Sequence, residues 1–93
     1  MDSIFYTCEN FDFFRDMMKV KFPLGNKYSK VEIVHTKPFD VYNNFKDVYV
    51  VITETSPRGI LIVPKSEDFN FEELKSKLEK ITRTKLEEFK NGN

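Results

Sequence analysis

The sequence predicts an α+β fold: an antiparallel three- to four-stranded sheet with an N-terminal helix and a long C-terminal amphipathic helix. Three observations lead to this fold class. Apolar residues recur at helical spacing near both ends of the chain. Between them lie two segments rich in β-branched residues, 48–55 and 60–63, separated by a turn. Short connections between strands favour antiparallel pairing. We expect residues 1–93 to form one domain, since 93 residues is a common domain size.

The first predicted elements are a short strand and a helix. Residues 3–6 are β-prone, and residues 8–20 follow a helical pattern. Thr7 or Asn10 could cap this helix, because either side chain can accept hydrogen bonds from the first free amides. The apolar residues Phe11, Phe14 and Met18 fall on one face of this helix, with Met17 beside them.

The middle of the chain predicts further strands. Residues 30–37 alternate in the manner of a strand, whereas residues 38–46 are expected to be irregular because a proline and two consecutive asparagines interrupt them. Residues 48–55 give the strongest strand pattern, with β-branched residues on both faces, which predicts a central strand that is covered on two sides. Residues 60–63 return as its hairpin partner.

The last predicted element is a helix over residues 71–90, about 30 Å long. Asn70 and Glu73 have the spacing of a capping box. Its apolar face consists of Phe71, Leu74, Leu78, Ile81, Leu86 and Phe89. The second face of the sheet then needs cover, which the first helix or a second copy of the chain could supply. We favour a homodimer.

Composition indicates a cytoplasmic protein. The chain has a single cysteine, so no intrachain disulfide can form, unlike in most small secreted domains. No apolar run approaches the roughly 20 residues needed to cross a bilayer. No basic, apolar start resembles a signal peptide. If the chain is encoded by a phage, the compartment is the host cytoplasm.

No residue pattern indicates an enzyme, a cofactor or a metal site. His35 is the single histidine, and no carboxylate or nucleophile is placed beside it by spacing. Cys8 could be activated at a helix N-terminus, but a lone cysteine is more often packing. One histidine and one cysteine do not complete a zinc site, and the three glycines are isolated, so there is no phosphate-binding loop.

The charges cancel overall but alternate in sign along the chain. Residues 1–16 carry a net charge of −3, residues 17–37 of +4, residues 38–73 of −4 and residues 74–93 of +3. The lysine-rich segments suggest one alternative function, a small nucleic-acid-binding domain in which cations and aromatic rings hold the strand. The residues concerned are Lys19, Lys21, Phe22, Lys27, Tyr28, Lys30 and Lys37, with Lys75, Lys77, Lys80, Arg83 and Lys85.

The acidic residues suggest the leading function, which is binding of a basic partner protein. The candidate partner-binding residues are Asp12, Asp16, Asp40, Asp47, Glu54, Glu67, Asp68, Glu72 and Glu73. Acids in a first helical turn also complement the helix dipole, and this explains Glu72 and Glu73 without any partner. It does not explain the acids elsewhere, which could dock on a basic surface.

The chain resembles small early proteins of T-even-type bacteriophages in its size, in its richness in Lys, Asn, Phe and Ile, and in segments such as the one from Phe11 to Met18. Among these it is most similar to the anti-restriction nuclease inhibitors of the Arn type. That resemblance implies a dimeric DNA mimic that blocks a host restriction endonuclease. A DNA mimic should be acidic, whereas this chain is neutral, so mimicry requires the two signs of charge to occupy different faces.

We therefore expect a non-catalytic, phage-type inhibitor that binds a host protein through a charged surface. The partner would be a DNA-binding protein such as a restriction endonuclease, with direct nucleic-acid binding as the alternative and no membrane partner.

Overall fold

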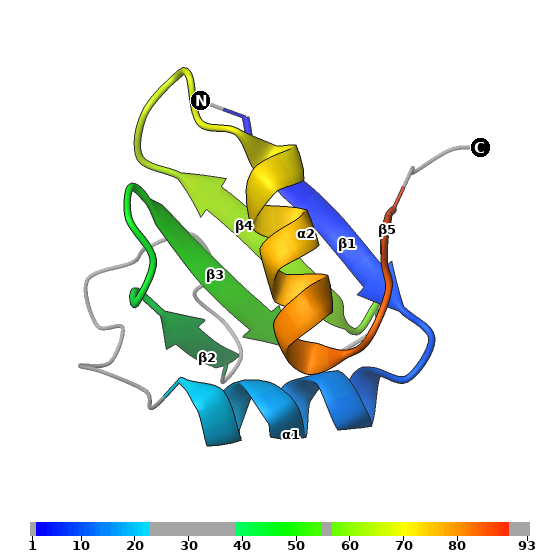
Figure 1. Ribbon diagram of the computed structural model, residues 1–93. Helices are drawn as coiled ribbons and strands as arrows, with labels where there is room; N and C mark the ends of the chain where they lie inside the picture. Colours follow the sequence, from blue (N-terminus) through cyan, green and yellow to red (C-terminus); the bar gives the residue numbers. More distant parts are fainter. Residues whose placement is uncertain (1, 23–38, 55–56, 90–93) are drawn as a thin grey trace.

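The described residues form one five-stranded antiparallel sheet with two helices on the same side (Figure 1). The computed structural model describes residues 2–22, 39–54 and 57–89. The strands are β1 (Ile4–Cys8), β2 (Phe39–Tyr42), β3 (Val48–Thr53), β4 (Gly59–Pro64) and β5 (Leu86–Glu88); the helices are α1 (Phe11–Lys21) and α2 (Phe71–Thr82). The order across the sheet is β2-β3-β4-β1-β5, so the N-terminal strand lies between the hairpin and the last strand.

The β3–β4 hairpin is the centre of the sheet, as the sequence predicts. Its register pairs Val50 with Ile62 and Ile52 with Ile60, and all four side chains are fully buried. The β-branched residues fit a pleated surface that is covered by helices. The predicted interior position of residues 48–55 is confirmed for the described part of this segment, since β3 has a neighbour on each side.

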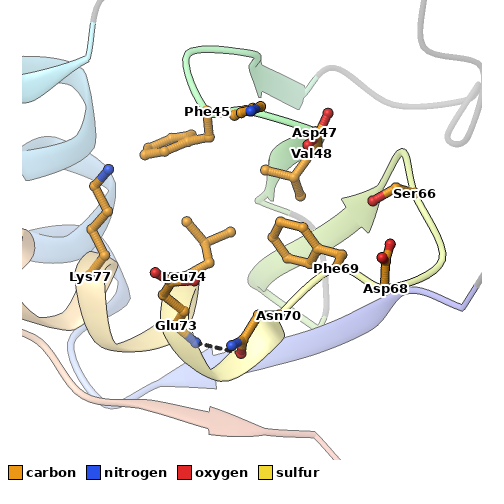
Figure 2. A pocket seen from close by; sticks show the side chains of 11 residues that line it. Phe45, Asp47, Val48, Ser66, Asp68, Phe69, Asn70, Glu73, Leu74 and Lys77 are labelled. Atoms are coloured by element: carbon orange, nitrogen blue, oxygen red, sulfur yellow. Dashed lines mark hydrogen bonds between the residues drawn. The ribbon is translucent and has the colours of Figure 1, made fainter.

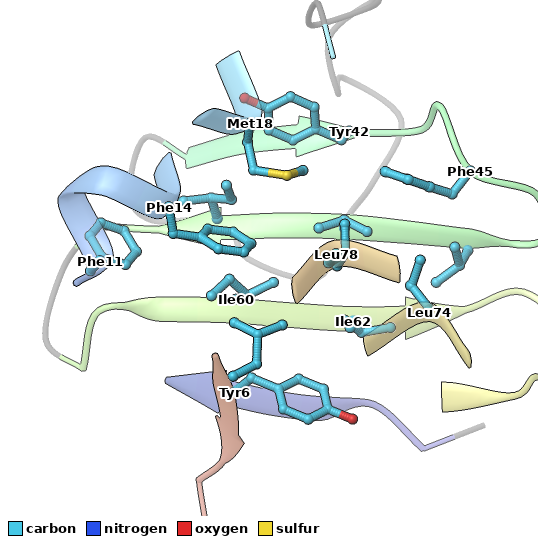
Figure 3. Close-up of a cluster of buried hydrophobic side chains, with 14 residues drawn as sticks. Tyr6, Phe11, Phe14, Met18, Tyr42, Phe45, Ile60, Ile62, Leu74 and Leu78 are labelled. Carbon is cyan, nitrogen blue, oxygen red and sulfur yellow. The ribbon is translucent and has the colours of Figure 1, made fainter. Parts of the chain in front are cut away.

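One apolar cluster joins both helices to the sheet (Figure 3). From α1 it contains Phe11, Phe14 and Met18, as the helical spacing predicts, and from α2 it contains Leu74 and Leu78. Each fully buried side chain of this size contributes roughly 1.5–3 kcal/mol relative to an exposed one. Because both helices pack against the same cluster, α1 does not cover the second face of the sheet. The prediction that the first helix could cover that face was therefore wrong.

Both helices begin at asparagine caps. The Asn10 side chain accepts a hydrogen bond from the Phe13 amide at 3.1 Å, and the Asn70 side chain accepts one from the Glu73 amide at 3.0 Å. Each such cap is worth about 1 kcal/mol. Of the two predicted caps for α1, the structure therefore selects Asn10, because Thr7 is part of β1.

The prediction of a long C-terminal helix was wrong. α2 has 12 residues and ends at Thr82, where Arg83 adopts a left-handed conformation with φ 57°. The Thr82 hydroxyl donates to the Leu78 carbonyl at 2.7 Å and the Thr84 hydroxyl to the Thr82 carbonyl at 3.1 Å, so threonine side chains satisfy carbonyls at the helix end. Leu86 then enters β5, where it is buried opposite Cys8.

Two other strand predictions were incomplete. Residues 39–42 fall in the segment expected to be irregular, yet they form β2, paired with β3. With β5, this raises the sheet from the expected three or four strands to five. The predicted strand at 30–37 lies outside the described residues, as does His35.

The buried hydroxyl of Tyr42 has no hydrogen-bond partner among the residues that the structure describes. We predict that Tyr42→Phe keeps or raises the free energy of unfolding at neutral pH, by up to about 1 kcal/mol, because an unsatisfied buried hydroxyl costs stability. Burial, and then the Asp40 carboxylate, raise the pKa of Tyr42 from 10.0 to about 12. The folded state therefore holds this proton more tightly than the unfolded state, and the wild type should lose stability as the pH rises from 10 to about 12.

Urea titrations at neutral and alkaline pH measure both effects. Tyr42→Phe should lose less stability than the wild type over the alkaline range, because its ring does not titrate. Tyr49→Phe is the matched control, since Tyr49 is a half-buried tyrosine on β3. Destabilisation of Tyr42→Phe by more than about 1 kcal/mol at neutral pH would mean that the hydroxyl makes a stabilising hydrogen bond.

Candidate functional site

The candidate site is a hollow where the β2–β3 turn meets the loop between β4 and α2 (Figure 2). We call it the acidic hollow. It has a volume of about 490 Å³. Its lining consists of Phe45, Lys46, Asp47, Val48, Ser66, Asp68, Phe69, Asn70, Glu73, Leu74 and Lys77.

The floor of the acidic hollow is apolar. The side chains of Phe45, Val48, Phe69 and Leu74 point toward one another in its interior (Figure 2). Phe45, Val48 and Leu74 also belong to the main core, so the floor is fixed by the packing of the whole molecule. Lys77 stands at one end with its ammonium 5.7 Å from the centre of the Phe45 ring, and Asp68 lies at the other end.

The two loops around the hollow are tied together by backbone geometry. Asp47 adopts φ 63°, a left-handed conformation that is uncommon outside glycine but tolerated by aspartate. Its carbonyl accepts a hydrogen bond from the Lys65 amide at 2.8 Å, which links the β2–β3 turn to the end of β4. The Asn70 cap then fixes the start of α2. The rim is therefore built on constrained backbone.

Three of the predicted acidic residues lie on this rim: Asp47, Asp68 and Glu73. All three are exposed, and within residues 2–22, 39–54 and 57–89 none of them forms an ion pair. Glu67 is also exposed and precedes Asp68 in the same loop. The structure thus brings together acids that are up to 26 positions apart in the sequence.

Three other predicted acids gather at a different place, where arginines neutralise them. The Arg15 guanidinium lies 3.3 Å from Asp12, 3.2 Å from Asp16 and 3.0 Å from Glu54, and Arg58 lies 2.6 Å from Asp12. Arg58 also stacks over the Phe11 ring at 4.5 Å. This ion-pair cluster joins α1 to the β3–β4 hairpin, and it does not present an open acidic surface.

The remaining two predicted acids belong to neither group. Asp40 lies on β2, near Tyr42. Glu72 is in the first turn of α2, and its charge acts on Tyr6 of β1: burial raises the pKa of Tyr6, and Glu72, Glu88 and Glu79 raise it further. The nine predicted residues therefore do not form one surface.

The predicted lysine-rich surface is also divided. Lys75 pairs with Glu79 at 3.4 Å, and Lys77 belongs to the acidic hollow. Lys21, Lys80 and Arg83 line a different groove, between the two helices. Lys27, Tyr28, Lys30 and Lys37 lie outside the described residues.

The pattern of residues in the sequence did not predict the apolar floor of the hollow. Phe14 is fully buried in the core, whereas Phe45 and Phe69 also line the hollow. The pair Phe69 and Phe71 pack edge to face at 5.3 Å, next to the acids Glu67 and Asp68. The alternation of aromatic and acidic residues in this segment was the feature of the sequence that could have indicated an apolar floor beside acids.

The described part of the chain shows neither a metal-binding cluster nor a membrane-spanning helix. No group of three or more histidine, cysteine or carboxylate side chains there is arranged to hold a metal ion. No helix there is long and apolar enough to cross a bilayer. No protein-family model, curated protein or solved structure matches the chain.

Cys8 is the last residue of β1, two residues before the helix cap, and it is half-buried. Burial raises the pKa of its thiol to about 11. We predict that iodoacetamide alkylates Cys8 roughly a hundredfold more slowly than free cysteine at neutral pH, because the thiolate is the reactive form. The rate should rise about tenfold per pH unit and level off only near pH 11.

Mass spectrometry of the alkylated chain over time gives this rate, with free cysteine in the same buffer as the reference. A rate equal to that of free cysteine, with a plateau near the ordinary cysteine pKa of about 8.5, would contradict the prediction. Cys8 would then again be a candidate nucleophile.

Proposed function

We propose that this chain is a non-catalytic binding protein that docks a basic partner protein through the acidic hollow. The proposal rests on a difference between two sets of acidic residues: one set forms ion pairs with arginines of the chain, and the other set does not within the described residues. Asp12, Asp16 and Glu54 are held by arginines of the chain itself. The rim acids surround an apolar floor, and no ion pair within the described residues engages them.

The combination of floor and rim suits a lysine or arginine side chain. Such a side chain can lay its aliphatic stem on Phe45 and Phe69 while its charged head reaches the carboxylates. An arginine has the further advantage of bidentate pairing with a carboxylate. Because the rim is held by the Asp47–Lys65 hydrogen bond and by the Asn70 cap, little ordering is needed on binding.

The more specific form of the proposal is a phage-encoded inhibitor of a host DNA-binding protein, such as a restriction endonuclease, acting as a DNA mimic. It rests on the resemblance to T-even phage early proteins. A partial separation of charge supports it: the hollow is lined by three carboxylates against the two lysines Lys46 and Lys77, whereas Lys80 and Arg83 follow at the other end of α2. A neutral chain can thus offer a locally acidic surface.

We predict that neutralising the rim abolishes binding of the partner. The variant Asp47→Asn, Glu67→Gln, Asp68→Asn and Glu73→Gln keeps side-chain size and leaves the Asn70 cap intact. Immobilised wild type should retain one stoichiometric protein from a bacterial host lysate, and this variant should lose it by at least about tenfold. Binding should also weaken with rising salt, because it depends on exposed charges.

The matched control neutralises the other acidic set by Asp12→Asn, Asp16→Asn and Glu54→Gln. It should retain the partner, because those carboxylates are already held by Arg15 and Arg58. Loss of the partner in the control but not in the rim variant would move the site to the ion-pair cluster. Tight, salt-sensitive binding of the wild type to duplex DNA in a mobility shift would reject the mimic form of the proposal.

The far face of the sheet supports a homodimer. Phe89 is 44% exposed there and packs edge to face with Phe5 at 5.7 Å. We predict that light scattering gives a mass of twice the 11.1 kDa chain at micromolar concentration, since pairing of two copies there would remove the exposed part of Phe89 from water. Phe89→Gln should shift the equilibrium to the monomer. A wild-type mass near 11.1 kDa would contradict the dimer.

A further inference from the structure

A groove between α1 and the end of α2 forms a second distinctive surface. It has a volume of about 710 Å³ and shares no residue with the acidic hollow. Its apolar lining comes from both helices and from the residue after α1: Phe13, Met17, Phe22 and Ile81. We call it the basic groove, because the polar part of its lining is cationic.

The apolar residues on the α1 side of this groove are not required by the core. α1 already buries one stripe, which contains Phe14 and Met18. Phe13 and Met17 lie one turn apart on a neighbouring stripe, and Val20 continues it at the seventh position from Phe13. Phe13 is 42% exposed and Val20 is 74% exposed. Exposed apolar residues that are grouped in this way mark a binding surface more often than scattered ones do.

The charged residues of the groove all have one sign. Lys21, Lys80 and Arg83 line it, and none of the described residues that line it carries a carboxylate. In the part of the chain that the structure describes, none of the three forms an ion pair. Lys21 and Lys80 lie in last turns, where a cation also complements the helix dipole. The dipole does not account for the apolar floor between these cations.

We propose that the basic groove binds a short acidic amphipathic segment of a partner protein. Apolar side chains of the segment insert between Phe13 and Ile81, and its carboxylates pair with Lys21, Lys80 and Arg83. Arg83 follows the helix end in a left-handed conformation, so its backbone is fixed beside the groove. The pattern is that of an amphipathic helix in an apolar groove, with charge complementarity at the rim.

Single-stranded nucleic acid fits the groove less well. Stacking on bases needs free aromatic faces; Phe13 is exposed, but the Phe22 ring already packs on Phe45 at 4.8 Å between centroids, which leaves one such face in the described lining. A short segment with a few carboxylates matches three cations, whereas a nucleic-acid strand would require a longer basic track.

The probe is a short fluorescein-labelled peptide with leucine and phenylalanine along one helical face and glutamate elsewhere. A second peptide carries lysine in place of each glutamate. Fluorescence anisotropy at low and high salt gives the affinity of each peptide for the full chain. We expect the glutamate peptide to bind, with an affinity that falls as salt rises, and the lysine peptide to bind at least about tenfold more weakly.

Two variants with matched controls locate the site. Phe13→Gln should weaken binding by about tenfold, whereas Phe71→Gln, which changes a half-buried phenylalanine outside the groove, should change it by less than about twofold. Lys21→Gln, Lys80→Gln and Arg83→Gln together should abolish both binding and its salt dependence. Lys19→Gln, Lys65→Gln and Lys85→Gln make the same charge change outside the groove and should retain binding. Circular dichroism confirms that each variant is folded.

Four results would overturn the proposal. They are failure of the glutamate peptide to bind at millimolar concentration, equal binding of the lysine peptide, an equal loss in Phe13→Gln and Phe71→Gln, and tighter binding of a single-stranded oligonucleotide than of the peptide. Because the rim variant of the acidic hollow leaves every groove residue unchanged, it should bind the glutamate peptide as the wild type does. Failure of one proposal is therefore distinguishable from failure of the other.

Discussion

Phe14 and Met18 of α1 and Leu78 of α2 are fully buried in one cluster with Ile60 and Ile62 of the central hairpin. This contact of two helices with one face of the sheet determines where the other features lie. It brings the two helices together, which forms the basic groove, and it holds Leu74 and Phe45 in place, which forms the floor of the acidic hollow. Both candidate surfaces therefore result from the packing of the two helices on one face of the sheet.

The distribution of charge follows from the helix dipole and from local pairing. Acids occur at the start of α2 and cations near the ends of both helices, where each sign is favoured by partial charges on the backbone. The arginines of the ion-pair cluster offset a further set of acids at the start of α1. A chain with no net charge thus presents an acidic hollow and a basic groove on different parts of its surface.

The elements with strong local patterns were predicted well. The hairpin of β-branched strands, the buried stripe of α1 and the cap at Asn70 each depend on residues close together in the sequence. β2 and β5 were missed because a short edge strand depends on its partner more than on its own sequence. The apolar residues Leu86 and Phe89 matched a helical period by coincidence: one is buried at the sheet edge and the other lies on the far face.

The sequence by itself determined the fold class, the position of the hairpin and the buried side of the first helix, because periodicity and turn chemistry are local properties. Only the tertiary structure decided which charges are open and which are paired. Arg15 meets Glu54 across 39 positions, and Asp47 reaches the same hollow as Glu73 across 26. Such contacts depend on how strands and helices pack, and composition gives no measure of that. The acidic residues can be named from the sequence, whereas their division into a held set and an open set required the fold.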